Sequence, residues 1–357
     1  MPVTLKDIAD RLGVARQTVA IAMGQNKGRV SDRLKSEIQR VANEMNYVPN
    51  FAAQRLKGVS TRTIGIYRRP DEYVLGQVFL SNLQLYFSQL GYSVVSCYSY
   101  DEDSHMQVRR LLSQGVDGWL DLEMSDYSLK LDSLDIPMVR CPYAAAGDFD
   151  FAVDHAAGTY EAMKTMLKCG RKRPLFLKTY GNDDDSIIHK PSQRKLEGIR
   201  QAMEEAGEPM PVLELCISDK QRNGLLVVRE LIRLKPDIIF CCNDYFAGRM
   251  VSLLIDAGVK VPDDIAVIGY DGLSLCDLCR VPLATIVQPM NLMAQKASEL
   301  LVKLIKTRSC HATPARTLLK PVFYPSTSCG MENARLNDLP IYDSFLHLET
   351  VLERTRM

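Results

Sequence analysis

The sequence predicts two unlike parts, an all-α helix-turn-helix head at the N-terminus and a larger α/β core of two lobes. Three observations support this prediction. The 357 residues exceed the roughly 150 residues that one domain ordinarily takes. Residues 1–62 hold 11 basic against 5 acidic side chains, whereas the remainder holds 33 against 38. From residue 63 onward, short apolar runs alternate with longer amphipathic segments, which is typical of βαβ units.

Helical spacing predicts two short helices at the start of the head. Thr4 fits the cap of a helix whose apolar residues recur at helical spacing until Gly13 breaks the run. The segment 16–23 predicts a second helix with one apolar face. The outward residues of that helix are Arg16, Gln17 and Ala20. Two helices joined through a glycine-containing turn have the layout whose second helix can enter a DNA major groove.

A third helix completes the predicted head. Ser31 can cap it, and its buried stripe is formed by Leu34, Ile38, Val41, Ala42 and Met45. A generic helical bundle over residues 1–47 is the alternative, because helix periodicity with modest charge does not specify DNA binding. The segment 47–58 favours DNA binding, since it holds a helix stop and then a very short amphipathic helix that Asn50 can cap.

Residues 4–62 resemble the DNA-binding head of the lactose/galactose repressor (LacI/GalR) family, through the stretches TLKDIADRLGVARQTVAIAM, VSDRLKSEIQRVANEMNYVPN and NFAAQRLKG. The resemblance implies that Arg16 and Gln17 read base edges and that Thr18 and Asn26 lie near phosphates. The residues predicted to bind DNA also include Thr4 and Ala20. The resemblance also implies a hinge helix that contains Asn50, Ala53 and Leu56.

Two positions of the head depart from the family pattern. Ala15 stands where the family usually has Ser, which removes a helix cap worth about 1 kcal/mol. Ile21 stands where the family usually has Arg, which removes a DNA contact; a bidentate base contact is worth roughly 1–3 kcal/mol of discrimination. The operator sequence therefore cannot be transferred from relatives.

The core begins at residue 63 with a strand-and-helix alternation. Predicted strands cover 64–67, 92–96, 115–120, 136–139, 174–177, 238–241 and 265–268, and predicted helices include 79–91 and 158–169. Ligands of open α/β sheets gather beyond the carboxyl ends of the strands. The polar residues directly after apolar runs are Arg68, Arg69, Asp154, Asn243, Asp244 and Asp271, which would face one interlobe site if the lobes pack mouth to mouth.

The resemblance to the family continues to about Thr327, and it is carried by SQRKLEG, PDIIFCCNDYFAGRM, VPDDIAVIGYDG and VPLATIVQP. These stretches look like the periplasmic-binding-protein-like core of the same regulators, in which the chain crosses between lobes three times. We expect crossings near 151–156, 285–289 and 318–322. The predicted domains are a head at 1–48, a hinge and linker at 49–62, a core at 63–328 and an extension at 329–357. Within the core, the N-lobe takes 63–153 and 287–318, and the C-lobe takes 154–286 and 319–328.

The resemblance also implies an effector site in the core. Arg194 and Asp271 occupy positions that usually hydrogen-bond a sugar's hydroxyls, with Asn243 and Asp154 as neighbours. Without the motifs, each residue would be read as half of a surface ion pair or as a strand-end cap. Two further residues have weaker support. Arg68 can select an anionic effector or be a solvated charge, and Trp119 can stack on a sugar ring or belong to the core.

Other patterns are set aside. The CxxC pair at Cys276 and Cys279 lacks a second pair at zinc spacing, and ten cysteines spread through a large chain favour reduced thiols. The motifs of hydrolases, kinases and dinucleotide-binding enzymes are missing, so we predict neither catalysis nor a metal or cofactor. No apolar stretch reaches the roughly 18 residues of a membrane span, which leads us to expect a cytoplasmic, nucleoid-associated protein with no membrane partner. The extension at 329–357 either packs on the body or forms an oligomer contact.

The functional hypothesis is a sequence-specific transcriptional repressor whose affinity for its operator is controlled by a small molecule, a sugar or sugar derivative. A homodimer, or a higher oligomer, would bind pseudo-palindromic double-stranded DNA, because one head makes too few contacts for a long operator. Two alternatives stay open. One is a two-lobed sugar-binding protein, and the other is a cytosolic sugar enzyme with an appended helical domain.

The hinge generates a prediction. A helix of about eight residues is shorter than the roughly 12–15 residues at which isolated helices become marginally stable, so it folds only when paired on DNA. The resemblance places Leu56 of both chains in a central minor-groove step. Leu56→Ala should weaken operator binding in a gel-shift titration while effector affinity stays nearly intact. Equal loss of both affinities would contradict the hinge hypothesis.

Overall fold

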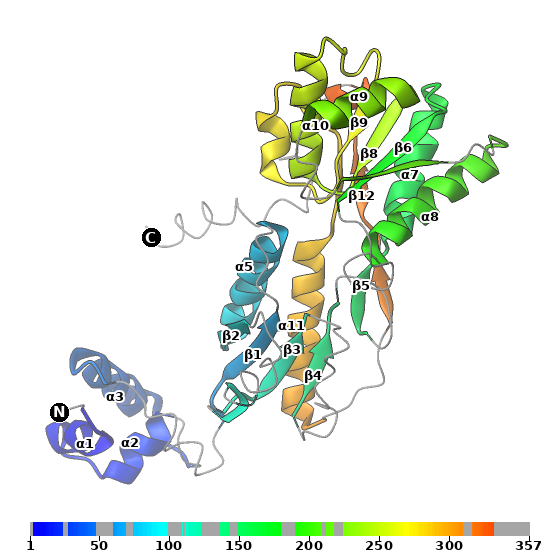
Figure 1. Cartoon of the computed structure of the whole chain (residues 1–357). Coiled ribbons are helices and arrows are strands. Elements are labelled where there is room, and N and C mark those ends of the chain that lie inside the picture. Colours follow the sequence, from blue (N-terminus) through cyan, green and yellow to red (C-terminus); the bar gives the residue numbers. More distant parts are fainter. Residues whose placement is uncertain are drawn as a thin grey trace.

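The computed structural model describes residues 3–23, 28–47, 60–68, 74–98, 109, 111–113, 115–122, 136–142, 149–179, 190–208, 212–217, 224–309 and 316–331 (Figure 1). The predictions on Asn26, Arg69, the hinge residues Asn50, Ala53 and Leu56, and the extension beyond 331 lie outside these ranges.

The head contains the three predicted helices, α1 (Leu5–Leu12), α2 (Arg16–Ala22) and α3 (Asp32–Glu44). The predicted caps are present, since Thr4 and Asp7 form a capping box and the Ser31 hydroxyl accepts the N–H of Leu34. Ala15 makes no side-chain cap bond. The core of the head is built around side chains with no exposed area, Ile8, Val19 and Ile38.

The structure corrects the outward placement of Ala20. This side chain is buried in the core of the head, with only 4% of its area exposed. Both α1 and α3 pack against α2, so the buried face of this helix is wider than a single apolar stripe and includes Ala20. A methyl group on that face helps close the three-helix core, and Arg16 and Gln17 remain the exposed residues of α2.

The N-lobe is a parallel sheet in the order β2-β1-β3-β4. Its strands are β1 (Thr63–Arg68), β2 (Ser93–Tyr98), β3 (Gly118–Asp121) and β4 (Met138–Arg140). Two helices pack on one face, α5 (Val74–Gln89) and α11 (Met290–Thr307). Because α11 follows the C-lobe strands in the chain, the N-lobe is completed only after the chain has passed through the C-lobe.

The C-lobe repeats this plan with a parallel sheet in the order β7-β6-β8-β9. Its strands are β6 (Pro174–Thr179), β7 (Leu213–Ile217), β8 (Ile238–Cys241) and β9 (Ala266–Ile268). One face packs against α7 (His155–Lys168) and α8 (Lys190–Glu205), and the other against α9 (Gly224–Leu234) and α10 (Asp244–Asp256). Both faces are covered, as parallel sheets require.

Short strands lie between the two sheets (Figure 1). β5 (Phe151–Val153) pairs in parallel with β11 (Thr317–Leu319), and β10 (Thr285–Val287) pairs antiparallel with β12 (Val322–Tyr324). Two 3-10 helices, η3 (Ser274–Leu278) and η4 (Thr327–Cys329), complete the elements described in the core. The residues at which one lobe ends and the other begins remain a prediction.

The contact between α7 and α8 generates a second prediction. Gly198 of α8 lies so close to α7 that an added methyl group would collide with the carbonyl oxygen of Ala156 and the hydroxyl of Thr159. Gly198→Ala should therefore lower the free energy of unfolding by about 1–3 kcal/mol through overpacking. Urea unfolding measures the change. The exposed neighbour Glu197→Ala should stay within about 0.5 kcal/mol of wild type, and equal losses in the two variants would contradict this contact.

Candidate functional site

Buried polar side chains gather at the carboxyl ends of the C-lobe strands and at the adjoining crossings. They follow β5, β8, β9 and β10, and α8 adds one more from its N-terminal turns. We call this set the polar cluster: His155, Lys195, Asp244, Tyr270, Asp271 and Gln288. All six residues are buried. The edge of the sheet where they meet is the edge at which ligands of α/β proteins bind.

Lys195 is the cation of the polar cluster. Its ammonium donates to the carbonyl oxygen of Cys242 at 2.8 Å and lies 3.6 Å from the centre of the Tyr270 ring, within cation–π range. Burial lowers the pKa of Lys195, and the negative charge of Asp271 opposes that effect. A buried ammonium with these contacts can bind an acceptor atom of a ligand.

Asp271 is the residue whose backbone is most constrained. Its φ of 116° lies in the left-handed region, which costs a non-glycine residue about 1–3 kcal/mol. β10 holds this conformation, because the N–H of Asp271 donates to the carbonyl of Ile286 at 2.9 Å and its carbonyl accepts the N–H of Gln288 at 3.2 Å. The strain fixes the direction of a carboxylate at the polar cluster.

The Asp271 carboxylate is only half satisfied within the described residues. Its Oδ1 accepts from the Gln288 side-chain amide at 2.7 Å, whereas its Oδ2 and the amide oxygen of Gln288 have no hydrogen-bond partner there, although both are buried. Burial raises the pKa of Asp271 to about 8, against the opposing effect of Lys195. When Asp271 is ionised, its Oδ2 and the amide oxygen of Gln288 are two buried acceptors without donors, which cost about 1–3 kcal/mol each. When Asp271 is protonated, its carboxyl supplies a donor itself. The site therefore suits a ligand with hydroxyl groups, which both donate and accept.

His155 and Tyr270 form the aromatic side of the polar cluster. The Tyr270 hydroxyl lies 2.7 Å from Nδ1 of His155, and the two ring centres are 5.5 Å apart. Burial and the neighbouring carboxylates raise the pKa of Tyr270. Its hydroxyl therefore stays protonated and can donate to the imidazole, which fixes the ring beside Lys195.

Asp244 braces the turn that follows Asp271. Its Oδ2 accepts the N–H groups of Gly272 at 2.8 Å and Leu273 at 2.7 Å, and its Oδ1 accepts from the Thr285 hydroxyl. Burial raises the pKa of Asp244 to about 7, although these hydrogen bonds lower it. These bonds hold the turn at Gly272 and Leu273, so Asp244 positions the backbone of the polar cluster.

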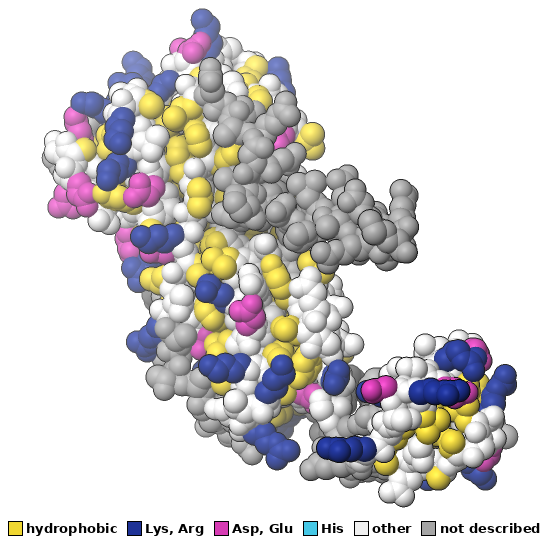
Figure 2. Space-filling view, turned by 180° about the vertical axis from the view of Figure 1, so that it is seen from behind, with side chains coloured by type: hydrophobic (Ala, Val, Ile, Leu, Met, Phe, Trp, Pro, Cys, Tyr) yellow, Lys and Arg dark blue, Asp and Glu magenta, His cyan; other side chains and the backbone are white. Residues whose placement is uncertain are grey.

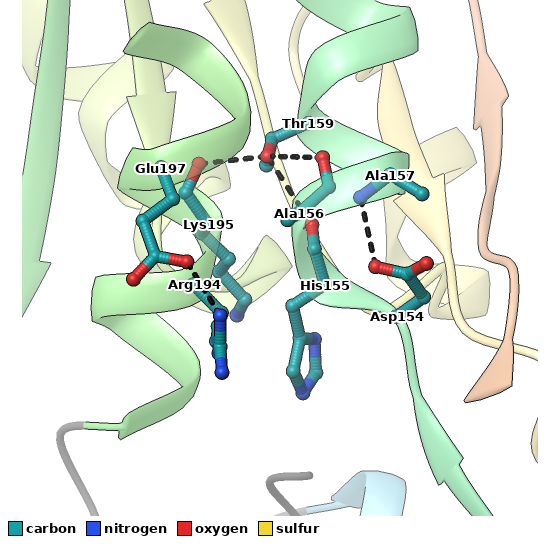
Figure 3. Close-up of polar contacts among 8 residues, drawn as sticks. All are labelled: Asp154, His155, Ala156, Ala157, Thr159, Arg194, Lys195 and Glu197. Carbon is teal, nitrogen blue, oxygen red and sulfur yellow. Dashed lines mark hydrogen bonds and ion pairs between the residues drawn. The ribbon is translucent and has the colours of Figure 1, made fainter. Parts of the chain in front are cut away.

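The structure brings Asp271 into the polar cluster but not Arg194. Arg194 leaves 54% of its side chain exposed and pairs with Glu197 at 2.8 Å, one turn along α8 (Figure 3). The adjacent residue, Lys195, is buried and joins the polar cluster, and the effector contact of Arg194 stays a prediction. The physical reason is helical phase, because Lys195 lies on the stripe of Ile199 and Ala202 that packs toward the C-lobe core.

The other predicted effector residues take structural positions. Asp154 caps α7 through the N–H of Ala157, as Figure 3 shows, and Asn243 caps α10 through the N–H of Phe246. Arg68 ends β1, and its side chain lies outside the described part of the chain. Asp154 and Asn243 border the polar cluster in sequence, next to His155 and Asp244.

The stacking role predicted for Trp119 is replaced by core packing. The side chain is 2% exposed and packs with Tyr67 and Leu111. Trp119 lies within β3 and not after it, on the sheet face opposite the one covered by α5 and α11. Its ring rests on Gly65, where an added methyl group would come within 2.7 Å. A Trp in this position stabilises the N-lobe.

The head presents a polar surface on α2. Arg16 and Gln17 are exposed, Thr18 is half-buried, and Thr4 uses its hydroxyl to cap α1. Lys and Arg side chains are spread over the face of the head that Figure 2 shows. An exposed Arg and Gln on a helix of this kind can donate to base edges in a major groove.

Three further properties of the described ranges concern metal-binding clusters, disulfides and membrane-spanning helices. No three His, Cys, Asp or Glu side chains there are arranged to hold a metal ion. Eight of the cysteines in these ranges are thiols outside any disulfide, and one of them, Cys276, is buried in the C-lobe core. No helix of the described ranges has both the length and the apolar character needed to cross a bilayer.

Comparison with known proteins decides the family. Residues 4–50 match the family of "Bacterial regulatory proteins, lacI family", and residues 180–329 match the "Periplasmic binding protein-like domain". The chain belongs to the LacI/GalR family. The HTH-type transcriptional repressor PurR of Vibrio parahaemolyticus is 29% identical over 317 residues, which cover 85% of this chain and 92% of that protein. PurR of Haemophilus influenzae strain PittEE is 28% identical over 319 residues, 85% of this chain and 91% of that protein.

Solved structures of LacI/GalR-type proteins share the fold. The lac repressor dimer bound to operator and the anti-inducer ONPF gives a TM-score of 0.76 at 22% identity, over 92% of this chain and 99% of that one. A complex of the transcriptional regulator CelR with cellobiose gives 0.62 at 23% identity, over 91% and 99%. These likenesses confirm the predicted head and the periplasmic-binding-protein-like core.

Sequence reasoning missed Lys195, His155, Tyr270 and Gln288. For Lys195 a signal was available, because it is four residues before Ile199 and seven before Ala202, on the apolar stripe of α8. His155 and Tyr270 lie one position from the predicted Asp154 and Asp271. Gln288 lies in the family stretch VPLATIVQP, but nothing in that stretch singled it out, since it reaches Asp271 only through the pairing of β10.

The buried carboxylate of this LacI/GalR-family protein generates a pH prediction. The folded protein holds the proton of Asp271 more tightly than the unfolded chain, because burial raises the pKa of Asp271 from 3.8 to about 8. Its contribution to the free energy of unfolding is therefore largest at low pH and is lost as the pH rises toward 8. Asp271→Asn cannot ionise. Urea unfolding gives the free energy of unfolding of wild type and of the variant. The difference, wild type minus variant, should decrease as the pH rises from about 5 to about 8. A constant or rising difference would contradict the assignment.

Proposed function

We propose that the protein is a transcriptional repressor whose affinity for operator DNA is controlled by a small polar effector bound at the polar cluster. The observation that carries the proposal is the pairing of a DNA-facing head with a core whose Asp271 and Gln288 bury acceptors that have no donor within the described residues. An effector would supply those donors. The protein acts where the operator lies, on the bacterial chromosome in the cytoplasm.

The chemistry of the polar cluster supports a sugar or sugar derivative. Adjacent hydroxyl groups each offer one donor and two acceptor lone pairs, which match the free Oδ2 of Asp271, the amide oxygen of Gln288 and the Lys195 ammonium. The cellobiose complex of CelR is consistent with such a ligand. A nitrogen heterocycle with neighbouring N–H groups would satisfy the same two acceptors, and the relatives named PurR make this class the alternative to include in the test.

Two copies of the chain would bind one operator. The fold-sharing lac repressor is a dimer on its operator, and an isologous pair of chains fits a DNA site with two-fold symmetry. The C-lobe also exposes large apolar side chains, Leu226 and Ile232 on α9 and Leu278 on η3, the last at 85%. A second copy would shield such side chains from water.

One experiment tests the proposal as a whole. The full chain selects duplexes from a random pool, and a panel of sugars, sugar phosphates and nucleobases is then screened for molecules that change the affinity for the selected duplex. We expect a palindromic site, binding that weakens steeply with salt, and an active compound in the panel. Turnover of a sugar without any selected duplex would favour the enzyme alternative.

Lys195 generates the matching mutational prediction. Lys195→Met removes the cation but keeps the length of the buried side chain, so the active compound should bind about tenfold more weakly or worse, as expected for a lost hydrogen bond to a charged group. Operator affinity without effector should change little. Lys168→Met, which removes an exposed cation from the last turn of α7, is the control and should respond like wild type. A normal response from Lys195→Met would remove it from the site.

A further inference from the structure

The chain enters the N-lobe through a segment held by one carboxylate. Asp117, which directly precedes β3, accepts the backbone N–H of Thr61 at 3.0 Å and that of Arg62 at 2.8 Å. It also accepts from the hydroxyls of Thr61, at 3.1 Å, and Ser60. Hydrogen bonds to a carboxylate are stronger than those between neutral groups. Residues 60–62 are therefore fixed on the N-lobe by Asp117.

Neighbouring backbone bonds make this junction rigid. The N–H of Ser93 on β2 donates to the carbonyl of Arg62 at 2.8 Å, and the N–H of Asp117 donates to the carbonyl of Thr63 at 2.8 Å. The buried Thr61 hydroxyl also lies 2.8 Å from the carbonyl oxygen of Gly115. Arg62 is held at a φ of 48°, in the left-handed region. The segment is thus attached to β2 and to the residues that directly precede β3.

The C-lobe contains the same device at the equivalent place. Asp237, directly before β8, accepts the N–H groups of Lys172 and Arg173, each at 2.9 Å, and its own N–H donates to the carbonyl of Arg173. In each lobe an Asp before the third strand of the chain thereby fixes the residues that enter the first strand. The two devices differ in what precedes them, because residues 172–173 follow α7 of the same lobe, whereas residues 60–62 follow the predicted hinge.

We propose that Asp117 is a positioning residue for operator recognition, because it fixes the point at which the hinge leaves the N-lobe. In a dimer, the two N-lobes would then set the distance between the two heads. The inference rests on the proposed function. A tether anchored at its last residue restricts the separations that two linked heads can reach, and a loosened tether widens that range. Asp117 would act through the linker without touching DNA.

Asp117→Asn is the direct test. An Asn side chain keeps the size but presents an amide donor to one of the N–H groups, so it cannot accept all the bonds of the carboxylate. The probe is the duplex selected by the wild-type chain from a random pool, together with versions whose centre is shortened or lengthened by one and two base pairs. Wild type should lose about tenfold or more affinity on each altered spacing, whereas Asp117→Asn should show a smaller loss and so a flatter profile.

Asp237→Asn is the matched control. It removes the same kind of backbone contact from the other lobe, so thermal unfolding should report similar destabilisation, but its spacing profile should stay as steep as that of wild type. If Asp117→Asn does not fold, Thr61→Val serves instead, because it removes a buried hydroxyl bonded to Asp117 and Gly115. Thr61→Val should lose less affinity than wild type on the duplexes with altered spacing.

Each outcome decides the inference. A profile as steep as that of wild type in the folded Asp117 variant, or in Thr61→Val where that variant does not fold, would overturn it. An equally flattened profile in Asp237→Asn, or a wild type that tolerates every spacing, would overturn it as well. A wild type that selects no duplex would remove the proposed function, and this inference with it.

Discussion

β10 connects the polar cluster to the N-lobe, and the arrangement of the two lobes depends on that connection. Its backbone bonds hold Asp271 at a left-handed φ, and the chain then passes through Gln288 directly into α11, which packs on the N-lobe sheet. A ligand that donates to the Asp271 carboxylate therefore contacts the crossing whose continuation is an N-lobe helix. Because packed elements move as units, a small change at Asp271 can alter how the lobes sit relative to each other.

The head was the part best predicted from sequence, and the reason is local. Its caps at Thr4 and Ser31 and its apolar stripes involve residues within a few positions of one another. Ala20 was misplaced because its burial depends on two helices packing on α2 at once, which periodicity within one helix does not reveal. The alternation of apolar runs and amphipathic segments likewise predicted the two sheets. That pattern depends only on which residues of each segment are buried, and so it is local too.

The site was predicted only in part, because it is assembled by long-range pairing. Asp271 follows a strand and lies in a family motif, so it was singled out, whereas Gln288, 17 residues further along the chain, joins it only through the pairing of β10. Lys195 was missed for a different reason. A motif matched by letters ignores helical phase, and one residue along a helix turns a side chain by about 100°. The phase of the apolar stripe on α8 would have chosen Lys195.

The central claim is that the polar cluster and the DNA-facing head are coupled, so the most direct measurement is thermodynamic linkage between the two. Calorimetric titration gives the affinity of the active compound for free protein and for protein saturated with the selected duplex, and fluorescence anisotropy gives duplex affinity with and without the compound. Coupling requires the same factor in both directions. We predict equal factors of about fivefold or more in wild type, within the usual range for allosteric proteins. A compound that binds the core with one affinity whether or not DNA is bound would contradict the account.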